Sequence, residues 1–201
     1  LSSAGFAQDM TLKLGHPANE DNIWHKASEK FAEEVATLTE GRIAVEVFPN
    51  ETLGKEMDVI NGMQLGTADM TITGESLQNW APMAALLAIP YGYTTLEDMD
   101  AVAGGEMGEQ IKAQIVEKVG IRPIAYFARG PRNLTSNRAI TSPDDLDGLK
   151  MRVPNVPLFL NVWQALGANP TPMAFSEVFT SLQNGTIGAQ ENPLALIKSA
   201  N

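Results

Sequence analysis

The 201-residue sequence contains no cysteine, few basic residues and no long hydrophobic run. Without cysteine the chain forms no disulfide, thiolate metal site or cysteine nucleophile, which fits a reducing compartment or an exported protein that needs no crosslinks. Lysine and arginine number 14 against 24 acidic residues, a formal net charge of −10. This balance, with no dense basic run, argues against nucleic-acid partners and anionic membrane surfaces. The apolar stretch at 81–89 is too short to span a bilayer, so no direct membrane insertion is expected.

Motifs for catalysis and for cofactor binding are also missing. Neither GxGxxG nor GxxxxGK[ST] occurs, and no GxSxG elbow is present. The two histidines, His16 and His25, are wrongly spaced for an HExxH site. We therefore expect no enzyme activity, no cofactor and no metal. An enzyme acting on a sugar acid, with Glu75 or His16 as general base, is the alternative from another class.

The apolar periodicity predicts a mixed α/β chain. Alternation predicts strands at 10–15, 42–48, 69–73, 121–127, 150–154 and 187–190, whereas helical spacing predicts helices at 22–40, 56–65, 96–102, 108–119 and 157–166. Another helix begins at Ser176, with Val178, Phe179 and Leu182 expected to face inward. A change to polar, turn-forming residues near 127–130 places a domain crossover there. We expect a first α/β lobe at 9–128 and a second at 129–201 that is incomplete at its C-terminus.

Arg152 lies inside a short apolar strand, between Met151 and Val153. A buried arginine needs an anionic partner, and its planar fork of donors matches a carboxylate. A structural salt bridge is the alternative, and this segment alone does not decide between the two. Four further residue types with binding chemistry stand at segment ends: Arg132, Asn192, Glu75 and Phe175. Two guanidinium groups, an amide, a carboxylate and an aromatic ring would suit a small polyhydroxylated acid.

Four motifs in register carry a family resemblance. They are RNLTSNR at 132–138, LKMRVPN at 149–155, PTPMAFSEV at 170–178 and QENP at 190–193, with Leu53-Gly54 and GTADM at 66–70 in support. Together they resemble the DctP-type substrate-binding proteins of tripartite ATP-independent periplasmic (TRAP) transporters, from about Asp9 to Asn201. The resemblance implies a two-lobed α/β periplasmic-binding-protein fold with a ligand cleft between hinged domains, a C-terminal part missing here, and delivery of an organic acid to the TRAP membrane subunits.

The resemblance also implies roles for individual residues. Arg152 matches the arginine that anchors the ligand carboxylate, and Arg132 matches a second arginine that adds to this recognition. Asn192 of the QENP motif completes that grip, and Phe175 lines the pocket. The first lobe is expected to contribute Glu75, which meets ligand hydroxyls, together with Glu56, His16 and Asn19. The loops that carry these residues, 16–19, 53–56 and 74–76, follow strands and should share one rim.

The sequence departs from the usual pattern of this family at Ile187 to Gln190, and from that of its sialic-acid binders at His16-Pro17. A uronate or aldonate sugar acid is therefore the preferred ligand, with sialic acid and C4-dicarboxylates or keto acids as alternatives. The N-terminal stretch ends in small residues, among them Ala4 and Ala7, as the sequence before a signal-peptidase site does. Residues 1–8 are therefore interpreted as a residual signal-peptide tail and flexible start of a periplasmic protein. A sensory domain on the same scaffold is a further alternative.

Overall fold

The computed structural model describes residues 9–200, and its chain divides into two compact units, residues up to 73 and residues 74–199. Each unit is described by itself. The signal-peptide tail expected at residues 1–8 lies outside the described residues. The two hinged lobes expected at 9–128 and 129–201, and the boundary between them, stay predictions.

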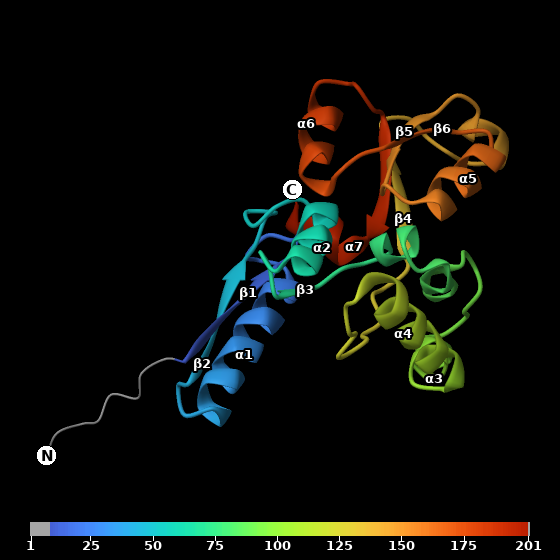
Figure 1. Cartoon of the computed structure of the whole chain (residues 1–201). Helices are drawn as coiled ribbons and strands as arrows, with labels where there is room; N and C mark the ends of the chain where they lie inside the picture. The colour runs from blue at the N-terminus through green and yellow to red at the C-terminus, as the bar shows by residue number, and fades with distance from the viewer. Residues whose placement is uncertain (1–8, 201) are drawn as a thin grey trace, which may run out of the picture. The chain divides into compact units, whose positions relative to one another are not determined.

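The first unit begins with a parallel βαβ motif. Strand β1 (Met10–Gly15), helix α1 (Ile23–Leu38) and strand β2 (Ile43–Phe48) follow in sequence, and β1 and β2 pair in parallel from Met10–Ile43 to Gly15–Phe48. Asn22 is the N-cap residue of helix α1, and its side chain accepts a hydrogen bond from the Trp24 backbone N–H at 3.0 Å. This cap satisfies one of the N–H groups that a helix start leaves without a partner. The βαβ unit expected from the sequence is therefore present (Figure 1).

Helix α2 (Glu56–Leu65) and strand β3 (Met70–Thr71) complete the first unit, and the sheet order is β2-β1-β3. Helix α2 ends at Gly66, which adopts φ 77°, a left-handed conformation that costs glycine little. Strand β3 is shorter than the predicted 69–73. Because all three strands are parallel, the loops after β1 and β3 leave the same edge of the sheet.

The second unit starts with short helices. Two 3₁₀ segments, η1 (Ser76–Asn79) and η2 (Pro82–Ala88), precede α3 (Leu96–Ala103) and α4 (Glu106–Val119). The buried stripe predicted along α4 is confirmed, because Ile111, Ile115 and Val119 are nearly inaccessible to solvent. These side chains recur at intervals of four residues and so lie on one face of the helix.

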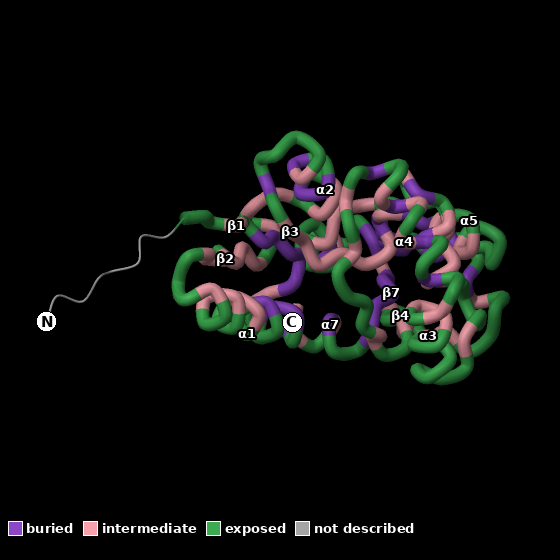
Figure 2. The backbone as a smooth tube through the Cα atoms, turned by 60° about the horizontal axis from the view of Figure 1, so that its bottom comes forward, coloured by how far each residue is buried: buried purple, intermediate pink, exposed green. Residues whose placement is uncertain are grey.

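A four-stranded sheet, in the order β4-β7-β5-β6, and the helices that connect its strands form the rest of the second unit. Its elements in chain order are β4 (Arg132–Ser136), η3 (Pro143–Leu146), β5 (Lys150–Val153), α5 (Pro157–Ala165), β6 (Asn169–Pro172), η4 (Phe175–Glu177), α6 (Val178–Gln183), β7 (Ala189–Pro193) and α7 (Leu194–Ser199). Strand β4 runs antiparallel to β7, whereas β7, β5 and β6 are parallel. Every residue of β7 is buried (Figure 2).

One face of this sheet packs against α5. Met151, Val153 and Ala189 are fully buried in a cluster that includes Phe159 of α5. Because neighbouring side chains of a strand point to opposite faces, Arg152 lies on the other side of the sheet from Met151 and Val153. The alternation that builds the core therefore also presents Arg152 on the opposite face.

Two local predictions are wrong. Residues 121–127 form no strand, and no strand of the described residues pairs with them. Their apolar alternation has no sheet neighbour to bury it, and Ile124 is 70% exposed. In α6, Phe179 and Leu182 are exposed, and only Val178 is buried. Val178 and Leu182 lie one turn apart on the same face of this six-residue helix, so the burial of that face is limited to the Val178 end.

Candidate ligand-binding site

Arg152 is the buried cation of the second sheet. It is 5% exposed, and its Nε donates a hydrogen bond to the Met173 carbonyl at 3.0 Å. Its guanidinium carbon lies 5.8 Å from the centre of the Phe175 ring. The hydrogen bond from Nε holds the guanidinium group of Arg152 in one orientation, and the aromatic ring adds a cation–π contact. The structure thus brings together Arg152 and Phe175, and their contact with a ligand stays a prediction.

A chain of buried amides lies beside Arg152. Gln190 stands opposite Arg152 in the β5–β7 ladder, and Asn192 follows two residues later on the same face. Asn192 Nδ2 donates to Gln190 Oε1 at 2.8 Å, and Gln190 Nε2 donates to Thr135 Oγ1 at 2.6 Å. Both amides are nearly inaccessible to solvent. Such satisfied polar networks fix side-chain orientation, so the amide plane of Asn192 is set before any ligand arrives.

Arg132 lies at the start of β4 and its donors are engaged within the chain. Its Nε donates to Glu191 Oε2 at 2.5 Å and its Nη2 donates to Glu191 Oε1 at 2.9 Å, a bidentate ion pair. Nη2 also donates to Asn192 Oδ1 at 3.0 Å. The guanidinium carbon lies 4.8 Å above the Phe159 ring. Arg132 therefore orients Asn192, and its expected contact with a ligand carboxylate stays a prediction.

Glu75 is shared by two arginines. Its Oε1 accepts hydrogen bonds from Arg129 Nη2 and, at 3.0 Å, from Arg132 Nη1. Its side chain is only 11% exposed. Burial alone would raise the pKa of Glu75, but the charges of Arg132 and Arg129 outweigh burial and hold that pKa below its usual value. The predicted contact of Glu75 with ligand hydroxyls would use a carboxylate that is already oriented by two guanidinium groups.

Glu191 is the second buried carboxylate of this group. Burial raises the pKa of Glu191, whereas the hydrogen bonds and charge of Arg132 and the charge of Arg152 oppose the rise. Both carboxylate oxygens of Glu191 accept hydrogen bonds from Arg132, which is the geometry of a bidentate ion pair.

The remaining predicted residues belong to the first unit. His16 is buried and its Nε2 lies 3.3 Å from His25 Nδ1. The loop after β1 is tied to the loop after β2, because the Glu51 N–H donates to the His16 carbonyl at 3.2 Å. Asn19 is half-buried in the same loop, and Glu56 accepts a hydrogen bond from the Thr73 hydroxyl. The contacts of His16, Asn19 and Glu56 with a ligand stay predictions.

Two functional candidates were missed from the sequence. Arg129 follows a stretch of apolar residues, and Glu191 was noted only as a letter of the QENP motif. A signal for Glu191 does exist, because an acidic residue inside a buried strand requires a cation. No local signal pairs either residue with its partner, since 54 positions separate Glu75 from Arg129 and 59 separate Arg132 from Glu191.

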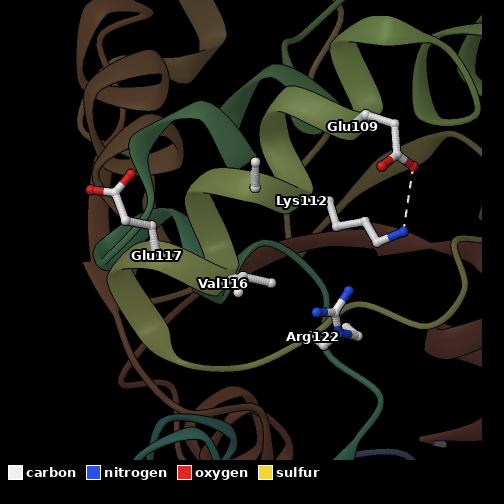
Figure 3. Close-up of a pocket in the computed structure, with 6 residues that line it drawn as sticks. Glu109, Lys112, Val116, Glu117 and Arg122 are labelled. Atoms are coloured by element: carbon white, nitrogen blue, oxygen red, sulfur yellow. Dashed lines mark hydrogen bonds and ion pairs between the residues drawn. The ribbon is translucent and has the colours of Figure 1, made fainter.

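A surface hollow lies elsewhere, along α4. It has a volume of about 370 Å³ and is lined by Glu109, Lys112, Ala113, Val116, Glu117 and Arg122 (Figure 3). Lys112 Nζ lies 3.4 Å from Glu109 Oε1, an ordinary ion pair on a helix surface. None of the predicted site residues lines this hollow, and its charged side chains are exposed, so it does not enclose an acid ligand.

Within residues 9–200, no group of three or more histidine, aspartate or glutamate side chains is arranged to hold a metal ion. In the same part of the chain, every helix is too short or too polar to cross a membrane.

Comparison with known proteins places the chain among solute receptors. A solute-binding protein of Roseobacter denitrificans is 79% identical over 200 residues, all of this chain and 62% of that protein. The crystal structure of a TRAP periplasmic solute-binding protein from that organism, with bound L-galactonate, has a TM-score of 0.95 and covers 96% of this chain and 65% of its own.

Two more distant relatives are named for other ligands. A TRAP solute-binding protein of Haemophilus influenzae with bound L-gulonate is 34% identical, with a TM-score of 0.89, and the match covers 95% of this chain and 63% of its own. The C4-dicarboxylate-binding periplasmic protein DctP of Rhodobacter capsulatus is 33% identical over 96% of this chain and 58% of that protein.

The chain spans about 60% of the length of these curated relatives. Residues 14–201 match the DctP family, described as bacterial extracellular solute-binding protein, family 7. The motifs at 132–138, 149–155, 170–178 and 190–193 all lie within this match, and the mixed α/β fold is that of the TRAP periplasmic binding proteins. The chain belongs to family 7 of the bacterial extracellular solute-binding proteins.

Proposed function

We propose that the protein captures a small sugar acid, an aldonate or a uronate, and delivers it to the membrane subunits of a TRAP transporter. Arg152 carries this proposal. It is a buried cation on one face of the second sheet, beside the oriented amides of Asn192 and Gln190 and the ring of Phe175. A carboxylate that meets the outer nitrogens of this guanidinium would gain two charged hydrogen bonds in fixed geometry.

The relatives support the sugar-acid class. The L-galactonate complex comes from a protein of 79% identity, and the L-gulonate complex from one of 34% identity. Both ligands combine one carboxylate with a chain of hydroxyl groups. An amide such as Asn192, which both donates and accepts, can bind a hydroxyl next to the carboxylate.

Binding without chemistry is the mechanism that these residues favour. A ligand that contacts both lobes of a hinged receptor binds the closed form more tightly than the open form, and this difference in affinity drives closure. In this proposal Arg152 and Asn192 hold the carboxylate, and polar groups of the first lobe engage the hydroxyls as the receptor closes. The periplasm is the compartment in which such a receptor meets its transporter.

A thermal-shift screen of the protein at its full encoded length tests the proposal. The panel contains L-galactonate, D-galacturonate, L-gulonate, sialic acid, succinate and neutral galactose. A ligand present at a hundred times its dissociation constant stabilises the folded state by about 2.7 kcal/mol. We expect the melting temperature to rise with the aldonates or the uronate and to stay unchanged with galactose. A rise with galactose alone, or with no member of the panel, would contradict the proposal.

A further inference from the structure

The side-chain amide of Asn192 is held at both of its ends. Its Oδ1 accepts a hydrogen bond from Arg132 Nη2 at 3.0 Å, and its Nδ2 donates one to Gln190 Oε1 at 2.8 Å. A single contact would fix one end of the amide and leave the group able to tilt about that end. Two contacts at opposite ends fix the plane of the amide, so Gln190 completes the orientation that Arg132 begins.

Arg132 determines the direction of each hydrogen bond in this series. Guanidinium nitrogens only donate, so the end of the Asn192 amide that faces Arg132 must be the oxygen. Nδ2 is then the end toward Gln190, which must present its own oxygen to accept. The Nε2 group of Gln190 in turn faces Thr135 Oγ1, which accepts at 2.6 Å. The four side chains therefore form one series with a consistent direction, from Arg132 through Asn192 and Gln190 to Thr135.

The backbone of Gln190 is fixed from both sides. Strand β7 lies between β4 and β5, and Gln190 pairs with Thr135 of β4 and with Arg152 of β5. Paired residues present their side chains on the same face of a sheet, so Gln190 stands in a row between Thr135 and Arg152. Its side chain is nearly inaccessible to solvent. A buried side chain on a strand that is paired on both edges is suited to hold a neighbouring side chain in place.

We propose that Gln190 is a positioning residue for acid binding, which acts on the ligand through Asn192 by holding the plane of the Asn192 amide. This inference rests on the proposed function, in which Asn192 contacts the acid. It gives Gln190 a different role from Arg152, its neighbour in the row, which in that function contacts the carboxylate directly. Thr135 supports Gln190 at the far end of the series.

A double-mutant cycle measured by titration calorimetry tests the inference in the full-length protein. The ligand is L-galactonate, or the acid of the thermal-shift panel that binds most tightly. Gln190→Met keeps the length of the side chain and removes its polar atoms. Loss of this orienting hydrogen bond should weaken binding by roughly threefold to tenfold. In the Asn192→Ala background the same change should alter the affinity by less than about twofold, because the group that Gln190 holds is no longer present.

Two changes at Thr135 test the far end of the series. Thr135 is exposed, so both changes are expected to leave the fold intact. Thr135→Val removes the hydroxyl that accepts from Gln190, whereas Thr135→Ser keeps a hydroxyl there. We expect Thr135→Val to weaken binding of the acid more than Thr135→Ser does. Gln110→Met is the matched control, because Gln110 is exposed on α4 and its substitution should leave the affinity unchanged.

The outcomes distinguish this inference from the proposed function. If the parent binds no acid of the panel, the proposed function fails and this inference fails with it. If the parent binds an acid and Gln190→Met, or Asn192→Ala, binds it equally well, the inference is wrong whereas acid binding stands.

Equal losses from Gln190→Met in the parent and in the Asn192→Ala background would also overturn the inference, since Gln190 would then contact the acid itself or hold another group. Urea unfolding of each variant separates a loss of stability from a loss of affinity. Should Gln190→Met fail to fold, the same cycle with Thr135→Val in its place decides the matter.

Discussion

Replacing Arg132 with methionine should destabilise the second unit strongly. The Glu191 side chain is only 3% exposed, and both of its carboxylate oxygens pair with Arg132. Methionine keeps much of the apolar stem over Phe159 but leaves a buried carboxylate without its cation. Breaking a buried ion pair in this way costs roughly 3–5 kcal/mol. Glu75 contributes little to this cost because it keeps its contact with Arg129.

Substituting the other partner of this ion pair, Glu191, should cost less stability. In Glu191→Gln the guanidinium of Arg132 still pairs with Glu75, so we expect a loss of about 1–2 kcal/mol, the cost of a poorly satisfied buried donor. The double variant, Arg132→Met with Glu191→Gln, should recover most of the stability lost in Arg132→Met. The coupling follows because glutamine at position 191 no longer carries a charge that needs a partner.

The penalty for Arg132→Met should also depend on pH. Burial already raises the pKa of Glu191, and loss of Arg132 raises it further above the value in the unfolded chain. The folded state then binds the proton more tightly than the unfolded state, so stability is retained at low pH and is lost as the pH rises through the pKa of the folded state. The variant should therefore be closest to the parent in acid.

Urea unfolding followed by circular dichroism measures all of these free energies. Lys112→Met is the control, because it removes an ion pair with Glu109 on the helix surface and should change stability by less than about 0.5 kcal/mol. A loss below about 1 kcal/mol in Arg132→Met, or a double variant as unstable as Arg132→Met, would refute the reasoning.

Two further predictions concern stability in the two units. Burial, and then the charge of His25, lowers the pKa of His16 from 6.5 to about 4, while a backbone hydrogen bond at Ala18 opposes the shift. Between these two pKa values the unfolded chain binds more protons than the folded chain, so His16 alone should lower the free energy of unfolding by about 2 kcal/mol from pH 7 to pH 5. The free energy of unfolding of His16→Asn should change less over this pH range, by that amount. Parallel pH dependences of the parent and His16→Asn would contradict the assignment. Met151 is fully buried, so Met151→Ala should cost about 2–5 kcal/mol in urea unfolding, whereas Leu38→Ala, at a position 79% exposed, should be nearly neutral. Equal losses in these two variants would show that the core is misplaced.

Local patterns were sufficient to predict several of the regular elements. The alternation at 10–15 and 42–48 gave the paired strands β1 and β2, and the helical spacing of Ile111, Ile115 and Val119 gave the buried face of α4. The position of Arg152 inside a short apolar strand indicated that the strand would be buried, and Met151, Arg152 and Val153 are all buried. These features depend on residues that are close in sequence.

Features that depend on distant partners could not be predicted. The strand expected at 121–127 has the right alternation, but a strand exists only where another strand pairs with it. The role of Glu75 depends on Arg129 and Arg132, more than fifty positions away. Its sequence context suggested a loop glutamate or a ligand contact, whereas the structure makes it a shared counter-ion. Glu191 was missed for the same reason.

Titration calorimetry of Arg152→Met with L-galactonate tests the central claim most directly. Methionine preserves the apolar stem beside Phe175 and removes the donors, and each charged hydrogen bond lost is worth roughly 1.5–3 kcal/mol. We expect the affinity of the full-length protein to fall at least tenfold, while Arg138→Gln, a change at an exposed arginine, leaves it unchanged. Binding of L-galactonate by folded Arg152→Met with parental affinity would contradict the account.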